Sequence, residues 1–283
     1  MNTLGDKLRV KRVKGDMGIE IELSGERLPG GVDLAHTLWR RDVDGSIKGA
    51  VDSGEYVLRS PVKINEVDKV LHDLDNAFIN HKTKIVPNIT TGTHVHVNVQ
   101  DLTPAQLISY VCCYLIVEEL MVDWCHPSRK GNHFCLRAID AEYLVRLLIE
   151  AIEHDNIRML ETEDIRYSSI NLLSLFKYGS VEFRALEGTN DFDKLRTWCN
   201  MLYKLKQNSL QFKSPKHVYE KISGEGSDAF LSRLLGEYAH LLKTVGWQRK
   251  IRNGIVISQD IAFARDWDQL NLNVFRPNQK TFS

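Results

Sequence analysis

Two short patterns in the sequence could supply metal ligands, and each places two like side chains two residues apart. The first is Glu20-Ile21-Glu22 and the second is His94-Val95-His96. Residues two apart on a β-strand point to the same face, so each pair is expected to project together. Taken alone, the acidic pair is typical of the solvent face of an amphipathic strand, and the histidine pair is equally compatible with exposed or hydrogen-bonded imidazoles.

A later segment and one earlier acid add to these patterns. In Val181-Glu182-Phe183-Arg184, the glutamate and the arginine share a face, which by itself is typical of a cross-strand ion pair. Glu55 is a further acid at the start of an expected strand. If these strands lie in one sheet, several carboxylates and imidazoles crowd on one face and need a cation. A carboxylate-rich set with a minority of imidazole favours Mg²⁺ or Mn²⁺, and the arginine is then a partner for phosphate.

Several common motifs are absent from the sequence. It has no G-x-x-x-x-G-K-[ST] or G-x-G-x-x-G loop, no H-E-x-x-H and no G-x-S-x-G. Asp42-Val43-Asp44-Gly45 is similar to the start of an EF-hand loop, but its glycine comes too early. Cys135 has no activating neighbours that would indicate a nucleophile. These absences exclude a P-loop and a dinucleotide-binding site.

Strands and helices that could position these residues follow from hydrophobic periodicity. Alternation predicts strands at Met17–Leu23, Tyr56–Leu58, Thr93–Val99, Ser168–Leu173 and Ser180–Leu186. Helical spacing predicts helices at Asn65–His81, Thr103–Trp124, Asp140–His154, Asp191–Gln211, Pro215–Ile222 and Asp228–Val245. We therefore expect an α+β fold, with a largely antiparallel sheet that has one apolar face covered by helices.

The chain is expected to form one domain over residues 1–283, with a motif-bearing core at about 17–191 and a helical part at about 191–283. Asp44-Gly45 predicts a hairpin turn, and the short link Phe176–Gly179 predicts a hairpin between the last two strands. After Trp247 the pattern is ambiguous, with Ile255-Val256-Ile257 a possible short strand and Phe275–Ser283 an expected loose tail.

Composition limits the function classes. The 283 residues include 37 Lys+Arg and 37 Asp+Glu, so the net charge of zero argues against a dedicated nucleic-acid binder. The longest apolar run, Tyr110–Val117, is too short to span a membrane, and the first residues have no apolar region typical of a signal peptide. The five cysteines form no C-x-x-C pair, so we expect reduced, buried thiols in a cytoplasmic protein.

Eight segments between Gly18 and Asp191 occur in an order that matches a known family. They are Gly18-Ile19-Glu20-Ile21-Glu22-Leu23, Asp44-Gly45-Ser46, Glu55 ahead of Ser60-Pro61, Gly92-Thr93-His94-Val95-His96-Val97-Asn98, Arg129 with Asn132-His133-Phe134, Arg166-Tyr167-Ser168-Ser169-Ile170-Asn171, Val181-Glu182-Phe183-Arg184-Ala185 and Gly188-Thr189. The series resembles the amidoligase family, the phage- and plasmid-associated branch of the glutamine synthetase and glutamate–cysteine ligase superfamily. It covers roughly two thirds of the chain, and the part after Asp191 carries no matching motif.

The resemblance implies a fold and a reaction. The fold is the curved antiparallel sheet of glutamine synthetase-like ligases, which forms a catalytic funnel. The reaction is ATP-dependent joining of a carboxylate to an amine, through an acyl phosphate, to give an amide of peptide or isopeptide type. Two or three Mg²⁺ or Mn²⁺ ions bridge the protein and the ATP phosphates in that superfamily.

The resemblance also implies residue roles. Metal ligands would be Glu20, Glu22, Glu55, His94 and Glu182. The nucleotide would be contacted by His96, Asn98 and Arg184. Catalytic arginines would be Arg184, Arg166 and Arg129, and the substrates would be bound by Arg129, Asn132, Arg166 and Asn171. The spacing from Glu55 to Ser60-Pro61 is longer than the family pattern, which makes Glu55 the least secure of these ligands.

Two other functions are compatible with the same residues. In the first, a metal-dependent hydrolase, His94, His96 and a glutamate hold Zn²⁺ or Fe²⁺ and activate water. In the second, a non-catalytic relative keeps the fold and acts as a binding protein. The sequence leaves open the carboxylate substrate, the amine substrate (ammonia, an amino acid, a polyamine or a protein lysine), and whether the chain forms a homo-oligomer.

Overall fold

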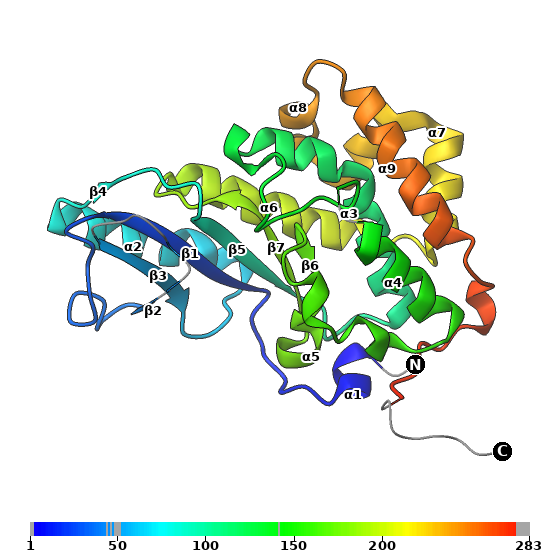
Figure 1. Ribbon diagram of the computed structural model, residues 1–283, viewed down its shortest axis with the longest axis horizontal. Helices are drawn as coiled ribbons and strands as arrows, with labels where there is room; N and C mark the ends of the chain where they lie inside the picture. The colour runs from blue at the N-terminus through cyan, green and yellow to red at the C-terminus, as the bar shows by residue number, and fades with distance from the viewer. Residues whose placement is uncertain (1–2, 44, 46, 48–51, 141, 276–283) are drawn as a thin grey trace.

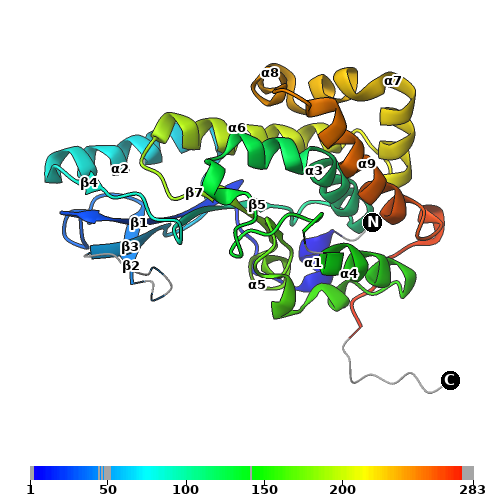
Figure 2. The ribbon, with the colours of Figure 1, turned by 45° about the horizontal axis from the view of Figure 1, so that its top comes forward.

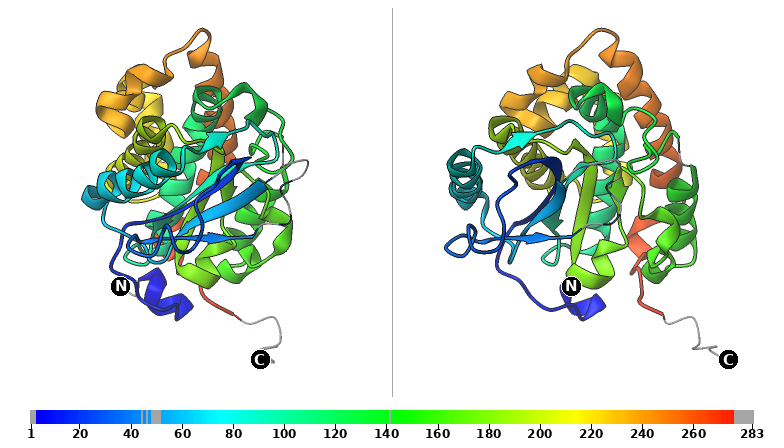
Figure 3. Two further views of the ribbon diagram at one scale, coloured as in Figure 1. Left: turned by 90° about the vertical axis from the view of Figure 1, so that its left-hand side faces the viewer. Right: turned by 60° about the vertical axis from the view of Figure 1, so that its left-hand side comes forward.

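The structure is a computed structural model that describes residues 3–43, 45, 47, 52–140 and 142–275. Its strands are β1 (Met17–Glu26), β2 (Trp39–Asp42), β3 (Asp52–Leu58), β4 (Lys84–Ile85), β5 (Gly92–Asn98), β6 (Ile170–Asn171) and β7 (Ser180–Glu187). These strands form one antiparallel sheet in the order β2-β3-β1-β5-β7-β6, and β4 pairs with the end of β1. The sheet is twisted and open, so the predicted α+β class is confirmed (Figure 3).

The helices are α1 (Leu4–Leu8), α2 (Val67–His81), α3 (Pro104–Trp124), α4 (Glu142–Glu153), α5 (Ser174–Tyr178), α6 (Phe192–Ser209), α7 (Pro215–Leu235), α8 (Ala239–Leu242) and α9 (Trp247–Ala262). Helices α2, α3 and α6 lie against one face of the sheet, and α7, α8 and α9 pack around α3 on its far side (Figures 1 and 2). Among the described residues, no long helix covers the opposite face of the central strands, so that face is available to a site (Figure 2).

Alternation along the strands decides which side chains face the helices. On β1, Ile19 and Ile21 are buried in the core, whereas Glu20 between them points to the open face. On β5, Val95 and Val97 are fully buried in the same core. Because side chains alternate with a period of two, the acidic and imidazole residues of both strands must share the other face.

Helix α3 is the central helix of the core. It begins with a capping box at Thr103, whose side chain accepts from the backbone N–H of Gln106. By length and composition alone it could cross a membrane, but 83% of its apolar window is buried inside the protein. Burial against the sheet and against other helices therefore accounts for its apolar composition. The five cysteines are free and buried, as expected.

The structure corrects several sequence-based predictions. The segment 255–257 is not a strand, because it lies within α9, where the buried residues Ile251, Ser258 and Ile261 follow helical spacing. The range of α7 contains two helices that meet at a kink at Gly226, whose φ is 82°, which agrees with the two helices predicted at 215–222 and 228–245, but the second helix ends at Leu235 instead of Val245. Strands β6 and β7 pair antiparallel as predicted, but the link between them contains the short helix α5 instead of a tight turn. Asp44 and Ser46 of the predicted turn, and the tail from residue 276, lie outside the described residues.

A buried carboxyl group on α3 ties this helix to the loops behind the sheet. Glu118 is 3% exposed, and it accepts hydrogen bonds from the hydroxyl of Ser169 and from the backbone N–H of Ala138 at 2.9 Å. Burial raises the pKa of Glu118 to about 7, although these two hydrogen bonds oppose the shift. The folded protein therefore favours the protonated form of this carboxyl group.

Glu118 is expected to make stability depend on pH. Because its pKa is raised on folding, its contribution is fully present below about pH 4.5 and is lost as the pH rises toward and through 7, by about 3 kcal/mol in total. Glu118→Gln should therefore gain stability relative to the wild type between pH 5 and pH 8, measured by urea unfolding. The exposed Glu220→Gln serves as control, and parallel pH profiles for wild type and Glu118→Gln would contradict the assignment.

Candidate metal and phosphate site

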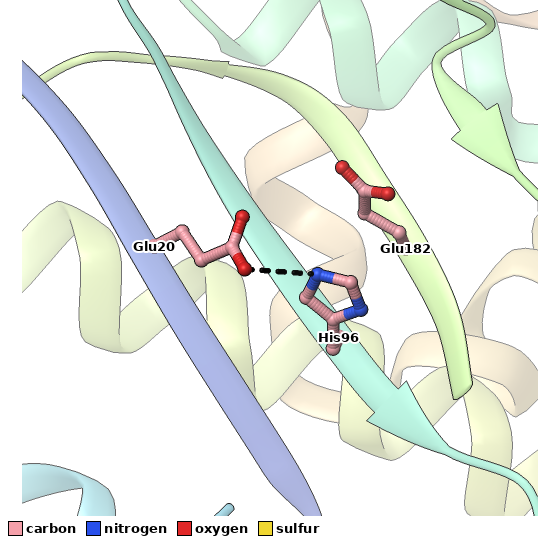
Figure 4. A group of neighbouring side chains, drawn as sticks. All are labelled: Glu20, His96 and Glu182. Atoms are coloured by element: carbon pink, nitrogen blue, oxygen red, sulfur yellow. Dashed lines mark ion pairs between the residues drawn. The ribbon is translucent and has the colours of Figure 1, made fainter. Parts of the chain in front are cut away.

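Cross-strand pairing brings the predicted acids and histidines into one row. Glu20 on β1 lies directly opposite His94 on β5, and His96 on β5 lies opposite Glu182 on β7. Figure 4 shows Glu20, His96 and Glu182 pointing toward one another from three adjacent strands. Glu20, His96 and Glu182 are at least 76 positions apart in sequence, and they form one cluster because their strands are neighbours.

The second acid of β1 extends the row toward β3. Glu22 lies opposite Glu55, and its Oε2 accepts a hydrogen bond of 2.7 Å from the backbone N–H of Gly92. A side chain at Gly92 would crowd the cluster, since a Cβ there would lie 3.2 Å from Nε2 of His94 and 3.6 Å from Oε2 of Glu22. The glycine therefore leaves room for the ligands around it.

The distances between the ligand atoms suit a cation. Nδ1 of His94 lies 3.6 Å from Oε2 of Glu20 and 3.7 Å from Oε1 of Glu182, and Nε2 of His96 lies 3.6 Å from Oε1 of Glu20. These separations exceed an ordinary hydrogen bond. Two ligand atoms that each lie about 2.1 Å from one ion can be up to about 4.2 Å apart, so an ion fits between them.

Two overlapping sets of three residues bring their ligand atoms close enough together to be candidate ion sites. The first set is Glu20, His96 and Glu182, and the second is Glu20, Glu55 and His94, with the ligand atoms of each set within 4.8 Å of one another. Glu20 is common to both sets. The arrangement can therefore hold two ions that share the Glu20 carboxylate. Each ion would have two carboxylates and one imidazole as ligands.

The electrostatics of the cluster keep its acids ionised. Burial would raise the pKa of Glu20, but the nearby imidazoles of His94 and His96 outweigh it and hold the pKa far below its usual range. Burial would also raise the pKa of Glu182, but the charges of His96 and Arg184 outweigh burial and lower that pKa. Despite burial, the contacts with Glu20 and Glu182 raise the pKa of His96. Ionised carboxylates are the form that binds a cation.

Two neighbours fix the orientation of Glu182. Arg184, two residues along β7, forms an ion pair with its Oε1, while Asn171 on β6 donates a hydrogen bond of 2.7 Å to its Oε2. Arg184 also donates to the backbone carbonyl of Phe134 at 3.3 Å. The carboxylate and the guanidinium are therefore both held in place at the edge of the cluster.

These groups line a cavity of about 470 Å³ on the open face of the sheet. Its lining includes the predicted residues Glu20, Glu22, Glu55, His94, His96, Arg129, Arg166, Asn171, Glu182 and Arg184. Ten further lining residues were not among the predicted site residues: Val43, Thr90, Gly92, Phe134, Glu163, Tyr167, Leu173, Ser174, Lys177 and Tyr178. Phe134 and Tyr167 lie beside predicted residues in the matched segments, whereas Lys177 and Tyr178 lie in the link that sequence reasoning assigned to a turn. The cavity thus has an acidic floor and a basic, aromatic rim.

A second cavity of about 410 Å³ adjoins the first. The two share Glu20, His96, Lys177 and Tyr178 in their linings. The second cavity has an apolar wall that includes Val57 and cationic side chains that sequence reasoning missed: Lys11, Arg40, Arg59 and Lys177. Its wall comes from segments far apart in sequence, so no local pattern indicates it.

The structure places two predicted asparagines away from the first cavity. Asn98 lines the second cavity instead, and its amide group is engaged by the backbone of Gly15 and Gln100. Asn132 lines neither cavity among the described residues, because its side chain bonds the backbone of Ile89, Ser128 and Phe134. Its position indicates a loop-stabilising contact.

Arg129 occupies an unexpected position. Its side chain borders the first cavity but is only 1% exposed, and its guanidinium donates to three backbone carbonyls, those of Thr91, Arg184 and Ala185. No carboxylate among the described residues forms an ion pair with it. Arg166 differs, because its side chain is 52% exposed and lies over the ring of Tyr167 at 5.0 Å.

Comparison with known proteins gives one family match. A protein-family model described as "putative amidoligase enzyme" matches residues 57–205, which are 149 of the 283 residues. The matched region includes β5, β7 and the arginines around the first cavity. No curated protein matches the chain.

Proposed function

The chain belongs to the amidoligase family, and on that basis we propose that it is an ATP-dependent ligase that joins a carboxylate to an amine. The proposed product is an amide of peptide or isopeptide type, formed through an acyl phosphate, with Mg²⁺ or Mn²⁺ as the metal. The observation that carries the proposal is the row of carboxylates and imidazoles from Glu55 to Glu182, flanked by Arg184.

The residues of this row fit a pair of divalent cations. One ion would be held by Glu20, His96 and Glu182, and the other by Glu20, Glu55 and His94. When bound, the cations supply charge neutralisation, which lets the phosphates of ATP and a second anion approach each other. Carboxylates outnumber imidazoles across the two sets, which favours Mg²⁺ or Mn²⁺ over the zinc of a hydrolase.

The two cavities suggest where each substrate binds. The apolar wall of the second cavity, with Arg40 and Arg59 nearby, suits the base and ribose of a nucleotide. Since His96 and Glu20 line both cavities, a nucleotide there would direct its phosphates toward the metal-binding row. The basic rim of the first cavity, at Arg166, is then left for the carboxylate substrate.

The reaction has two balanced steps. An oxygen of the acid attacks the γ-phosphorus of ATP, the bond to the β–γ bridging oxygen breaks, and ADP leaves. The amine nitrogen then attacks the acyl carbon, the bond from that carbon to the phosphate oxygen breaks, and inorganic phosphate leaves, while the proton lost by the amine passes to the phosphate or to water. Arg184, fixed by Glu182 and Phe134, would stabilise negative charge on the transferred phosphoryl group.

Binding of the nucleotide can be tested by thermal unfolding of the EDTA-treated protein. We expect MgATP at a hundred times its dissociation constant to stabilise the fold by about 2.7 kcal/mol, and ATP or Mg²⁺ alone to do much less. Magnesium tripolyphosphate should stabilise less than MgATP, because it cannot fill the apolar part of the second cavity. Stabilisation by Zn²⁺ alone, with no response to MgATP, would replace the ligase with a metal-dependent hydrolase.

A further inference from the structure

A groove between α4 and α9, separate from the two cavities described above, carries exposed apolar side chains. It measures about 510 Å³ and is lined by both helices and by Ala138 and Ile139 ahead of α4. Ile139 is 44% exposed and Val256 is 61% exposed, while Val145, Ile149 and Ile257 are half-buried between them. The two helices pack against each other at the edge of the molecule (Figure 1).

The rim of this groove is strongly acidic. Glu142, Glu150, Glu153 and Asp260 line it, and Arg146 is the one cation among the described lining residues. Arg146 lies 3.8 Å from Glu150, whereas the carboxylates of Glu142, Glu153 and Asp260 have no ion-pair partner among the described residues. An apolar floor with a surplus of three negative charges is complementary to a ligand that has apolar and cationic faces.

The dimensions of the groove suit a short helix. Helix α4 has 12 residues and is therefore about 18 Å long, which matches roughly three turns of a helix laid beside it. Amphipathic helices bind to apolar grooves through side chains spaced i, i+3, i+4 and i+7. The cations of such a helix would then face the acidic rim.

The groove is connected to the first cavity by a short piece of chain. Phe134 lines the cavity and Ala138 lines the groove, and four residues span at most about 14 Å when extended. The connecting segment is fixed, because the backbone of Leu136 pairs with Tyr167 and Ser169. The linings of the groove and of the cavity are therefore within about 14 Å of each other along this segment, which is the length of about four extended residues.

We propose that the α4–α9 groove binds a lysine-rich amphipathic segment of a partner protein, and that this partner supplies the amine. Lysine side chains complement the acidic rim and are themselves primary amines that can form an amide. The docking part of the proposal stands on the groove alone, whereas the amine part rests on the proposed ligase function.

Docking can be tested with a fluorescein-labelled 14-residue peptide of Leu, Lys and Ala, with leucines at helical spacing. Fluorescence anisotropy at low salt should give roughly tenfold tighter binding than for the same peptide with Glu in place of Lys. The double variant Glu150→Lys, Asp260→Lys should weaken binding of the lysine peptide about tenfold. Glu26→Lys, an exposed reversal on β1, should change it less than about twofold.

Several outcomes would overturn docking. Equal binding of the two peptides, or equal effects of the groove and β1 reversals in variants with unchanged circular dichroism, would show that the groove does not recognise basic segments. A dimer in light scattering that the groove reversals dissociate would instead make the groove a contact between copies of the chain.

The proposal that the docked partner supplies the amine is tested separately, by acylation of the lysine peptide. With MgATP and an acid that supports ADP release, the lysine peptide should gain the mass of the acyl group. The groove reversals should raise KM for the peptide about tenfold and leave ADP release with ammonia unchanged. A peptide that binds but is never acylated, by an enzyme active on ammonia, overturns the amine part. Absence of ADP release with every acid and amine would count against the ligase itself and leave the docking result intact.

Discussion

Replacing Glu20 with glutamine is expected to lower the rate of ADP formation by about 100- to 1,000-fold and to abolish stabilisation by MgATP. The reason is that Glu20 is the carboxylate common to both ligand sets, so the substitution weakens two metal positions at once. A neutral amide also binds a divalent cation less well than a carboxylate. Steady-state kinetics and thermal unfolding at several Mg²⁺ concentrations measure the two effects.

The matched control is Glu26→Gln, at the exposed end of the same strand and outside both cavities among the described residues. It should leave the rate of ADP formation within about twofold of the wild-type rate, and it should leave the stabilisation by MgATP unchanged. Full activity of Glu20→Gln with unaltered Mg²⁺ dependence would remove the shared carboxylate from the proposed site. Function in the host retained by an inactive variant would support a binding protein instead.

Alternation made the face of each strand predictable. Ile19 and Ile21 are buried and Glu20 is directed to the open face because a period of two allows no other arrangement on a half-buried strand. The strands around Glu20, His94 and Glu182 were therefore identified from sequence, together with their shared face. The family resemblance added Arg129, Arg166 and the three asparagines, which spacing alone did not supply.

The order of the strands and the composition of the cavities were not predictable in this way. The pairing of β1 with β5 joins residues more than 70 positions apart, and no local pattern encodes such contacts. The strand β2 (Trp39–Asp42) is short and does not alternate, so its Arg40 was missed in the second cavity. In α9, the run 255–257 is β-branched, but packing of the whole helix against α3 outweighs that local preference.

Arg129 is positioned to stabilise the fold, whereas Arg166 is positioned to bind the acid substrate, and substitutions can separate these two roles. Arg129→Met should lower the free energy of unfolding by about 3 kcal/mol or more, because three buried carbonyls lose a charged donor. Those carbonyls belong to Thr91, Arg184 and Ala185, so the guanidinium ties the chain before β5 to strand β7. Urea unfolding measures the loss.

Arg166→Met is the matched comparison, since its side chain is half exposed at the cavity mouth. It should change stability by less than about 0.5 kcal/mol, yet raise KM for the acid substrate. Arg129→Lys should recover only part of the lost stability, because one ammonium cannot reproduce the planar fork that reaches three carbonyls. If Arg129→Met were as stable as the wild type and raised only KM, Arg129 would be a substrate clamp. The carbonyl contacts would then be incidental, and the shape of the cavity wall would have to be maintained by β5 and β7 alone.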